Sequence, residues 1–354
     1  MLLKAKLSQG KLPFEIGQDA IKPSAPYAFS KLSRAKPTEV YTTYWKFAAE
    51  RQRVFHRRAA GKPQPWTDDS ILRTYRFTNA YRAADRVSQF LIQSVIYDGS
   101  PETAEVVFRI LLFKFFNRIS TWQKLVKAFG SVTWEGFDFE RYAAALTSMM
   151  DRGERVFSSA YIMPSYAPGF RESRKHCNFL RLLDMMMKDS LPKRLSSTKE
   201  FSEVFALLRA YPLLGDFLAF QFSIDLNYSE IISYDEMDFV VAGPGAKSGL
   251  RKCFSSPGDL SETDLIRMVT ESQQEEFERV GEDFQGLWGR PLMLIDCQNL
   301  FCEVDKYARV AHPLVEGIGS RTRIKQSYIA NSESVQYWFP PKWGLDTQVR
   351  VKGE

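Results

Sequence analysis

The polar residues of the segment 75–86 are the first in this sequence that could carry chemistry. Four of them are spaced at i, i+4, i+7 and i+11, the positions that share one face of a continuous helix: Tyr75, Asn79, Arg82 and Arg86. Asp85 follows Arg82 by three residues, and apolar residues occupy the stripe beside them. Such a helix is expected to be covered on several sides. Its polar groups either line a ligand site or form a buried ion-pair network that joins helices.

Positive charge is concentrated in the first 90 residues. The chain has 48 Lys and Arg residues against 42 Asp and Glu, a net charge of +6. Residues 1–38 carry seven basic residues against two acidic ones, and residues 41–90 carry ten against four. A local basic excess is the electrostatic footprint of nucleic-acid binding, so we expect a nucleic acid as partner and non-specific phosphate contacts from the N-terminal lysines.

Several other chemistries lack their residues. The three histidines lie near no serine or cysteine nucleophile motif, and the four cysteines form no zinc-type cluster, so we predict neither a triad nor a metal site. The segment 243–249, GPGAKSG, has Ala246 and Val241 where a phosphate-binding loop requires glycine, which leaves a turn before a helix as its interpretation. No apolar run is long enough for a signal peptide or a membrane span, so we expect a cytoplasmic protein.

Helical periodicity dominates from about Val40 onward. Arg51 and Arg58 fall within the apolar stripe of the first predicted helix, and each therefore needs a partner. Lys114 and Asn117 either reach solvent or line a pocket. The other predicted helices are one that begins at Thr67 or Asp68 and runs to about Tyr97, then 104–119, 139–150, 200–211, another after the turn at 212–215, and an acidic helix in 271–283; alternation in 321–339 predicts a small β-element.

Four motifs occur in a fixed order: YWKFAAERQ at 44–52, PWTD at 65–68, YRFTNAYRAADRV at 75–87 and DCQNLFCEVDKY at 296–307. They resemble the α-glutamyl/putrescinyl-thymine pyrophosphorylases, or amino acid:DNA transferases, which are relatives of the helical domain of bacteriophage 5-hydroxymethyluracil DNA kinases. The resemblance covers roughly residues 40–310. Because several long motifs agree in order, a chance match is an unsatisfactory explanation.

The resemblance implies a mainly α, helix-hairpin-helix DNA glycosylase-like fold with a small β-containing C-terminal extension. The segment 213–219 is similar to the hairpin of that fold, although Phe217 replaces its second glycine. Asp238 lies about where such glycosylases place their catalytic aspartate. The expected organisation is a basic N-terminal arm at 1–39, a catalytic domain at 40–310 and an extension at 311–354.

The implied activity replaces the pyrophosphate of 5-pyrophosphoryloxymethyl-uracil in phage DNA with an amine, after base flipping. Its partners are double-stranded DNA with modified thymine, an amino acid or polyamine, and a DNA kinase that acts upstream; Mg²⁺ could accompany the pyrophosphate. The implied site residues are Asp238 as the base with Asp225 and Glu303 behind it; Arg51, Arg76, Arg82, Arg86, Lys114 and Lys247 for phosphate; and Asn79, Gln221 and Tyr75 for the uracil.

Two other functions fit the same residues. A base-excision glycosylase acting on modified thymine follows from the fold analogy and Asp238. A non-catalytic DNA-binding module that partners a 5-hydroxymethyluracil DNA kinase fits the charge distribution, but gives no role to the polar helix surfaces.

Overall fold

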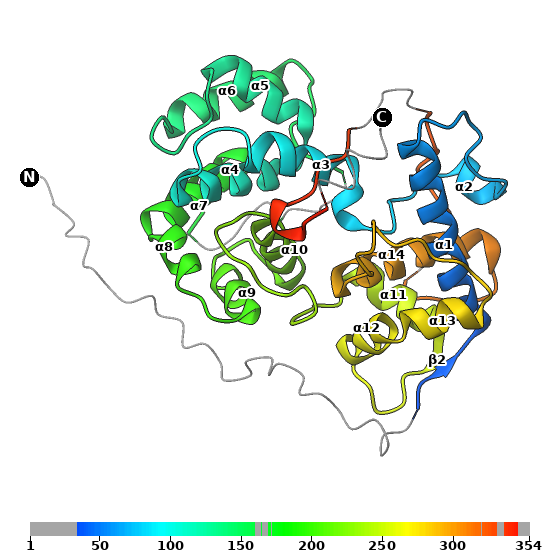
Figure 1. The fold of residues 1–354 in the computed structure, drawn as a ribbon. Coiled ribbons are helices and arrows are strands. Elements are labelled where there is room, and N and C mark those ends of the chain that lie inside the picture. Colours follow the sequence, from blue (N-terminus) through cyan, green and yellow to red (C-terminus); the bar gives the residue numbers. More distant parts are fainter. Residues whose placement is uncertain are drawn as a thin grey trace, which may run out of the picture.

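The computed structural model describes residues 34–159, 164, 169–170, 172–319, 321–330 and 336–345. In this part of the chain there are fourteen α-helices, shorter helical turns and one two-stranded sheet (Figure 1). The prediction of a mainly α fold is therefore confirmed. Most of the predicted N-terminal arm, residues 1–33, lies outside the described residues. No described helix is both long enough and apolar enough to cross a membrane.

One group of helices is built around α1 and α14 (Figure 1). The ring centroids of Tyr44 and Phe301 lie 4.6 Å apart between these two helices, and Trp45 packs against Phe277 at 4.8 Å. The elements of this group are α1 (Glu39–Ala59), α2 (Ser70–Thr74), α11 (Pro244–Cys253), α12 (Glu262–Glu271), α13 (Gln273–Arg279) and α14 (Leu294–Ala311), with β1 (Lys36–Pro37) paired antiparallel to β2 (Phe254–Ser256).

The glycines of 243–249 serve helix packing. Gly243 is the N-cap of α11, and neither it nor the two glycines that follow has a positive φ. A Cβ on Gly249 would lie 2.0 Å from the carbonyl oxygen of Phe301, and one on Gly245 would lie 2.9 Å from Cys302 Sγ. Glycine spaced four residues apart thus lets α11 approach α14 closely, which explains this segment without any phosphate.

The second group is built around two helices that are buried on almost all sides, α4 and α10 (Figure 1). Helices apolar around most of their circumference belong in a core. α9 and α10 flank the predicted hairpin turn, in which Leu213 adopts φ 68° and Gly215 caps α10. The elements are α4 (Thr103–Phe116), α5 (Ile119–Phe129), α6 (Phe139–Asp151), α7 (Lys175–Lys188), α8 (Leu191–Ser196), α9 (Phe201–Arg209) and α10 (Asp216–Asn227).

The segment between the two groups corrects the prediction of one long helix up to Tyr97. α2 begins after Asp69, whose carboxylate caps Ile71 and Leu72, and ends at Thr74. Residues 75–81 are irregular, and a 3₁₀ turn η2 (Arg82–Ala84), α3 (Arg86–Leu91) and a π-helical turn η3 (Ile92–Ile96) follow. Backbone N–H groups here donate to tertiary acceptors, Arg76 to Gln326 and Thr78 to Glu303, so tertiary hydrogen bonds override the helical pattern.

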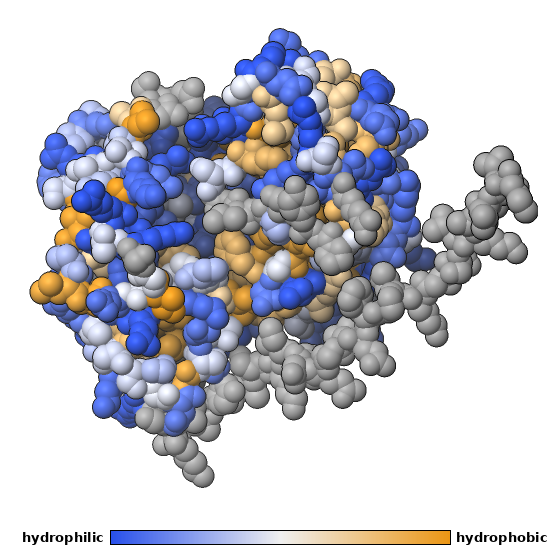
Figure 2. Space-filling view, turned by 180° about the vertical axis from the view of Figure 1, so that it is seen from behind, coloured by the Kyte–Doolittle hydropathy of each residue, from blue (hydrophilic) through white to orange (hydrophobic). Residues whose placement is uncertain are grey.

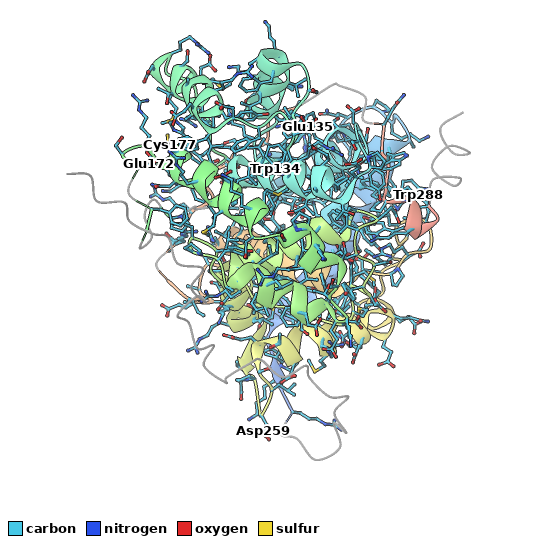
Figure 3. All side chains as sticks on the ribbon, turned by 90° about the vertical axis from the view of Figure 1, so that its left-hand side faces the viewer. Trp134, Glu135, Glu172, Cys177, Asp259 and Trp288 are labelled. Atoms are coloured by element: carbon cyan, nitrogen blue, oxygen red, sulfur yellow. The ribbon has the colours of Figure 1, made fainter. Side chains whose placement is uncertain are left out.

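The described part of the C-terminal extension crosses this central segment. Ser327 pairs with Tyr75 in an isolated bridge, and the remaining described residues of 321–339 form no strand; residues 331–335 lie outside the description. Residues 336–345 continue through the turn η4 (Pro341–Trp343) and lie between the two helix groups (Figure 1). In Figure 3, Trp288 lies beside η4, in agreement with its contact with Phe339 at 5.8 Å.

The molecular surface mixes polar and apolar residues. Figure 2 shows charged and polar side chains over most of the rear face, with apolar residues in separate patches between them. The most exposed large apolar residues of the described chain are Leu314 and Ile329, at 94% and 84% exposure. Both residues lie within the C-terminal extension, residues 311–354.

Candidate functional site

A buried charge network lies where the two helix groups meet. Arg82 Nη1 donates to Asp225 Oδ1 at 2.8 Å and to the Tyr228 hydroxyl at 3.1 Å. Arg82 Nε donates to Gln221 Oε1 at 3.0 Å. Arg82 is only 4% exposed and Asp225 is fully buried. η2 and α10 are thereby joined by a charge-assisted hydrogen-bond network.

Lys114 of α4 completes the network from the other side of Asp225. Its Nζ lies 2.9 Å from Asp225 Oδ2 and donates to Asn117 Oδ1 at 2.9 Å. Lys114 and Asn117 are 3% and 5% exposed, so the interpretation of these residues as solvent-reaching tips is wrong. Burial opposes ionisation of Asp225, but Arg82 and Lys114 outweigh it and hold the pKa of this carboxyl below its ordinary value.

Arg51 organises a second, half-buried cluster. Its Nε donates to the Thr78 carbonyl oxygen at 2.9 Å and its Nη2 to Asn79 Oδ1 at 2.8 Å. Asn79 in turn donates from its backbone N–H to Asp85 Oδ1 and from Nδ2 to the Ala84 carbonyl oxygen. The arginine in the apolar stripe of α1 thus finds its partners on the irregular segment, whose loop it helps to shape. Arg58, the other arginine of that stripe, stacks over the Trp66 ring at 5.6 Å.

Asp85 and Glu303 supply the carboxylates of this second cluster. Glu303 Oε2, from α14, accepts from the Thr78 backbone N–H at 2.9 Å and from Lys306 Nζ at 2.7 Å. Burial raises the pKa of Asp85 to about 7; Glu303 adds to the rise, and the nearby arginines, among them Arg51, oppose it. A carboxyl with this pKa can accept a proton near neutral pH, which is what a general base requires.

Asp85 is a functional candidate that the sequence pattern did not single out. Its spacing from Arg82 suggested an ion pair on one helical face, but Arg82 pairs with Asp225 instead, and Asp85 accepts from the Asn79 backbone N–H. The clearest signal was its place inside the motif 75–87, next to Asn79 and Arg82.

Two further buried carboxylates were also missed. Burial raises the pKa of Glu236 to about 7 and that of Asp296 to about 6. Glu236 pairs with Arg290 at 2.9 Å, and Asp296 accepts from the Arg82 backbone N–H at 2.8 Å. Asp296 stood within the motif 296–307, whereas nothing in the sequence marked Glu236.

Three predicted binding residues lie along the edge of the second cluster. Arg76 and Arg86 are exposed, and neither guanidinium pairs with another described residue; Tyr75 is half-buried. Gln221, the predicted base reader, lies instead within the buried network, 3.5 Å from Gln298 of α14. The predicted residues therefore separate into a buried set and a set that solvent can reach.

Asp238 and Lys247 lie apart from both clusters. Asp238 is an exposed loop residue whose carbonyl oxygen accepts from Arg267 at 3.1 Å, and partial burial raises the pKa of its side chain. Lys247 forms an ion pair with Glu262 at 3.0 Å. No described hydrogen bond or ion pair joins either residue to Asp85 or Asp225. Their predicted roles stay predictions.

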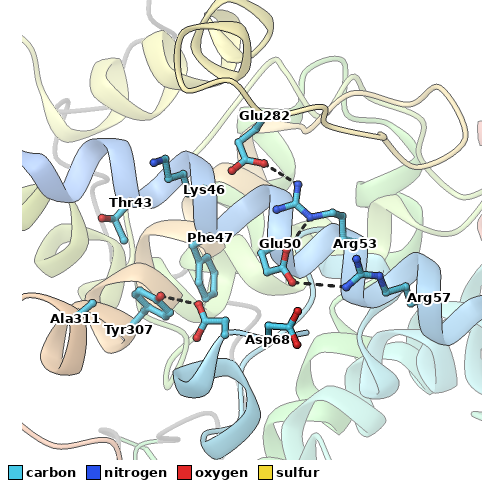
Figure 4. A pocket seen from close by; sticks show the side chains of 11 residues that line it. Thr43, Lys46, Phe47, Glu50, Arg53, Arg57, Asp68, Glu282, Tyr307 and Ala311 are labelled. Carbon is cyan, nitrogen blue, oxygen red and sulfur yellow. Dashed lines mark hydrogen bonds and ion pairs between the residues drawn. The ribbon is translucent and has the colours of Figure 1, made fainter. Parts of the chain in front are cut away.

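An open cavity of about 470 Å³ lies on another face of α1 (Figure 4). Arg53 bridges Glu50 and Glu282 across it, each at 2.7 Å. Phe77 packs against Phe47 and Tyr307 of its lining, so an aromatic layer separates it from Thr78 and the second cluster. Among the described residues, no group of three or more His, Cys, Asp or Glu side chains is placed to hold a metal ion.

The region that contains both clusters matches a known protein family. The sequence matches the family described as 5-hmdU DNA kinase, helical domain, over residues 38–317. A curated relative, the 5-hmdU DNA kinase of Bacillus phage SP10, is 30% identical over 285 residues, which are 76% of this chain and 45% of the relative. The chain thus spans less than half of that relative's length. No solved structure matches. The chain belongs to the family of 5-hmdU DNA kinase helical domains.

Proposed function

We propose that this protein is a DNA-modifying transferase that acts on 5-pyrophosphoryloxymethyl-uracil in phage DNA, in the host cytoplasm. The amine nitrogen of an amino acid or polyamine forms a bond to the exocyclic methylene carbon of the extruded base. The carbon–oxygen bond breaks, pyrophosphate leaves, and a proton of the amine passes to a protein base. The observation that carries this proposal is the half-buried Asp85, with its pKa raised to about 7, beside Arg51.

Asp85 fits the role of the base better than Asp238 does. An amine attacks only when it is neutral, so its ammonium form must lose a proton near physiological pH. Asp85 is held by the Asn79 backbone N–H and lies within reach of the fields of Arg51 and Arg82, whereas Asp238 lies on an exposed loop. Glu303 then acts behind Asp85, since it fixes Thr78 and raises the proton affinity of Asp85.

The leaving pyrophosphate needs cations that solvent can reach. Arg76 and Arg86 are exposed at the edge of the cluster and fit this role or that of DNA phosphate contacts. Arg82 and Lys114 are committed to Asp225, so we assign them to holding the segment 82–86 in place. Mg²⁺, if it takes part, would be brought by the pyrophosphate oxygens. For Asn79 to read the base edge, its side-chain amide, which accepts from Arg51 and donates to the Ala84 carbonyl oxygen, would exchange one of these bonds for the uracil.

The upstream chemistry must convert a hydroxymethyl group into a pyrophosphoryloxymethyl group, by two successive phosphoryl transfers or one pyrophosphoryl transfer, because hydroxide is a poor leaving group and pyrophosphate a good one. A kinase such as the 5-hmdU DNA kinase to which the chain is similar would supply phosphoryl transfer of this kind. Within this chain the glycines of 243–249 pack α11 against α14 and so give no support to a phosphate-binding loop of its own.

The test is mass spectrometry of nucleosides from duplex DNA that contains 5-pyrophosphoryloxymethyl-uracil, after incubation with the protein and a mixture of amino acids and polyamines. A new thymine adduct with stoichiometric pyrophosphate release supports the transferase and identifies its amine. Abasic sites would instead show a glycosylase.

A second function has one observation in its favour: the matched family is named for a domain of a kinase, and the chain covers 45% of the curated relative. The protein would then be a non-catalytic module that presents DNA to a kinase. Tight binding of the modified duplex, with its mass unchanged after incubation with every amine, would support this function and contradict the transferase.

A further inference from the structure

The C-terminal extension is bound to the segment between the two helix groups that carries Asp85, and the extension residues that make these contacts, from Gln326 onward, lie beyond the matched region 38–317. The Tyr328 backbone N–H donates to the Thr74 carbonyl oxygen, and the Arg76 N–H donates to that of Gln326, both at 2.9 Å. Further along, the Trp338 N–H donates to Gln89 Oε1 at 2.9 Å. The extension is therefore attached on both sides of residues 77–86.

Tyr337 lies in this extension with its ring buried and its hydroxyl uncommitted. The ring packs against Phe55 of α1 at 4.7 Å, and the whole residue is 9% exposed. No described residue forms a hydrogen bond with the phenol oxygen. This oxygen is also not one of the completely buried polar atoms that lack a partner in the described chain, so it is not sealed inside the protein. The hydroxyl of a largely buried tyrosine ordinarily has a hydrogen-bond partner. Because the Tyr337 hydroxyl has none among the described residues, it is available to a ligand.

The charges around Tyr337 are those of the second cluster. Burial raises the pKa of its phenol, Arg58 and Arg51 oppose that rise, and Asp85 adds to it. Tyr328 is fixed beside the same segment by the hydrogen bond from its backbone N–H to the Thr74 carbonyl oxygen, and its phenol acts electrostatically on Arg51. Tyr328 is 37% exposed, so part of this residue meets solvent.

We propose that Tyr337 and Tyr328 bind the extruded pyrimidine, and that the C-terminal extension therefore completes the Arg51–Asp85 site. The Tyr337 hydroxyl donates to a uracil carbonyl oxygen, and the Tyr328 ring stacks on the base. Hydrogen bonds to the base edge and stacking on aromatic rings are the two interactions by which flipped bases are held. This inference rests on the proposed function, which requires the base to leave the helix.

The test is binding of the full-length protein, without any amine, to two duplexes that differ at one base: 5-pyrophosphoryloxymethyl-uracil or thymine. A neighbouring 2-aminopurine reports extrusion by its fluorescence. Thymine has the same carbonyl oxygens and ring, so these contacts favour the modified duplex only because its base is the one that is extruded. We expect Tyr337→Phe to lose roughly tenfold of that preference, the effect of one unmet hydrogen bond. Tyr328→Ala should lose a similar factor through stacking. Tyr234→Phe is the matched control, because the Tyr234 hydroxyl forms a hydrogen bond with Thr198 within the helix group built around α4 and α10.

Each outcome of this binding experiment either supports or contradicts the role of the two tyrosines. Loss of preference in Tyr337→Phe and Tyr328→Ala, with melting temperature and thymine-duplex affinity unchanged, supports the inference. Wild-type preference and extrusion retained by both variants would overturn it and leave the proposed function intact. A wild-type protein that neither prefers the modified duplex nor raises the 2-aminopurine signal would contradict base flipping, and the inference with it.

Discussion

The two polar clusters of this protein use the same residue types in different surroundings. In the first, Arg82, Lys114 and Asp225 are each at most 4% exposed, and two cations face one carboxylate. In the second, Arg51 and Asp85 are half-buried and are linked through Asn79. The pKa of Asp225 is lowered by its ion pairs, whereas that of Asp85 is raised by burial to about 7.

The difference shows that a buried carboxylate in direct contact with cations has a structural role, whereas a buried carboxylate without such contact can take part in proton transfer. Asp225 has a cation on each oxygen, which favours its ionised form, and it joins η2, α4 and α10. Asp85 has a backbone N–H as its hydrogen-bond partner and its cations at longer range, so its proton can come and go near neutral pH. Perturbed carboxyls of the second kind are those that catalysis uses.

The largest effect should follow from Asp225→Asn. Removal of the charge leaves Arg82 and Lys114 buried without a counter-ion, which costs about 3–5 kcal/mol in comparable ion pairs. We expect the free energy of unfolding, measured by urea denaturation, to fall by that amount.

The control for this change is Asp184→Asn, which breaks an exposed ion pair with Lys188 on α7. Exposed pairs contribute about 0.2–1 kcal/mol, so little change is expected there. Equal losses in the two variants would show that burial does not set the strength of the first network.

Asp85→Asn should lower the transferase rate roughly a hundredfold, the low end of general-base contributions, without lowering the melting temperature at neutral pH. The amide oxygen can still accept the hydrogen bond from the Asn79 N–H, so the loop should hold its shape. Asp238→Asn serves as the comparison, with an expected change below about twofold for an exposed carboxylate outside the site. If Asp238→Asn is the inactive variant, the base is Asp238 and the second cluster is not the catalytic one.

The transferase rate should depend on pH through the ionisation of Asp85. Rate at saturating amine should rise about tenfold per pH unit up to pH 7 and then level off, because Asp85 must lose its proton to act. Arg51, Arg82, Glu303 and Tyr337 are the charged and titratable groups that face it. Asp85→Asn should abolish this inflection, and an unchanged inflection in that variant would assign it to another group.

The contribution of Asp85 to the stability of the fold should fall over the pH range in which the transferase rate rises. The folded pKa of Asp85 lies above its unfolded value, so its contribution to stability is fully present below about pH 4 and is lost as pH rises to 7. Asp225, with its lowered pKa, contributes stability above about pH 4 that is lost in more acidic solution. Thermal melts of the two Asn variants across pH 3–8 measure both contributions.

The smallest effect concerns the exposed edge of the second cluster. Arg86→Gln should reduce the slope of log affinity against log salt by about 0.9, the value for one phosphate contact, with a few-fold loss of DNA affinity. Lys188→Gln, which removes an exposed cation already paired with Asp184, is the control and should leave the slope unchanged. An unaltered slope for Arg86→Gln would place the DNA on another face.

Much of the fold and of the site followed from local pattern. Periodicity placed the helices at 104–119, 139–150 and 200–211 close to α4, α6 and α9, and the apolar stripe of α1 required partners for Arg51 that the structure shows. The motifs 75–87 and 296–307 contain Asn79, Asp85, Asp296 and Glu303. These features depend on side chains a few residues apart, which the sequence displays directly.

The remainder depended on contacts between distant segments. The run from Thr67 to Tyr97 reads as one helix because it lacks Gly and Pro, yet Gln326, Glu303 and Arg51 take its backbone groups at 76–79 and keep it irregular. That irregularity turns Arg82 inward to Asp225 and leaves Asp85 beside Arg51. The sequence by itself determined a helical protein with basic character and its polar motifs; the tertiary structure alone decided which carboxylate is locked in an ion pair and which is free to titrate, because burial and the position of charges are properties of the folded chain.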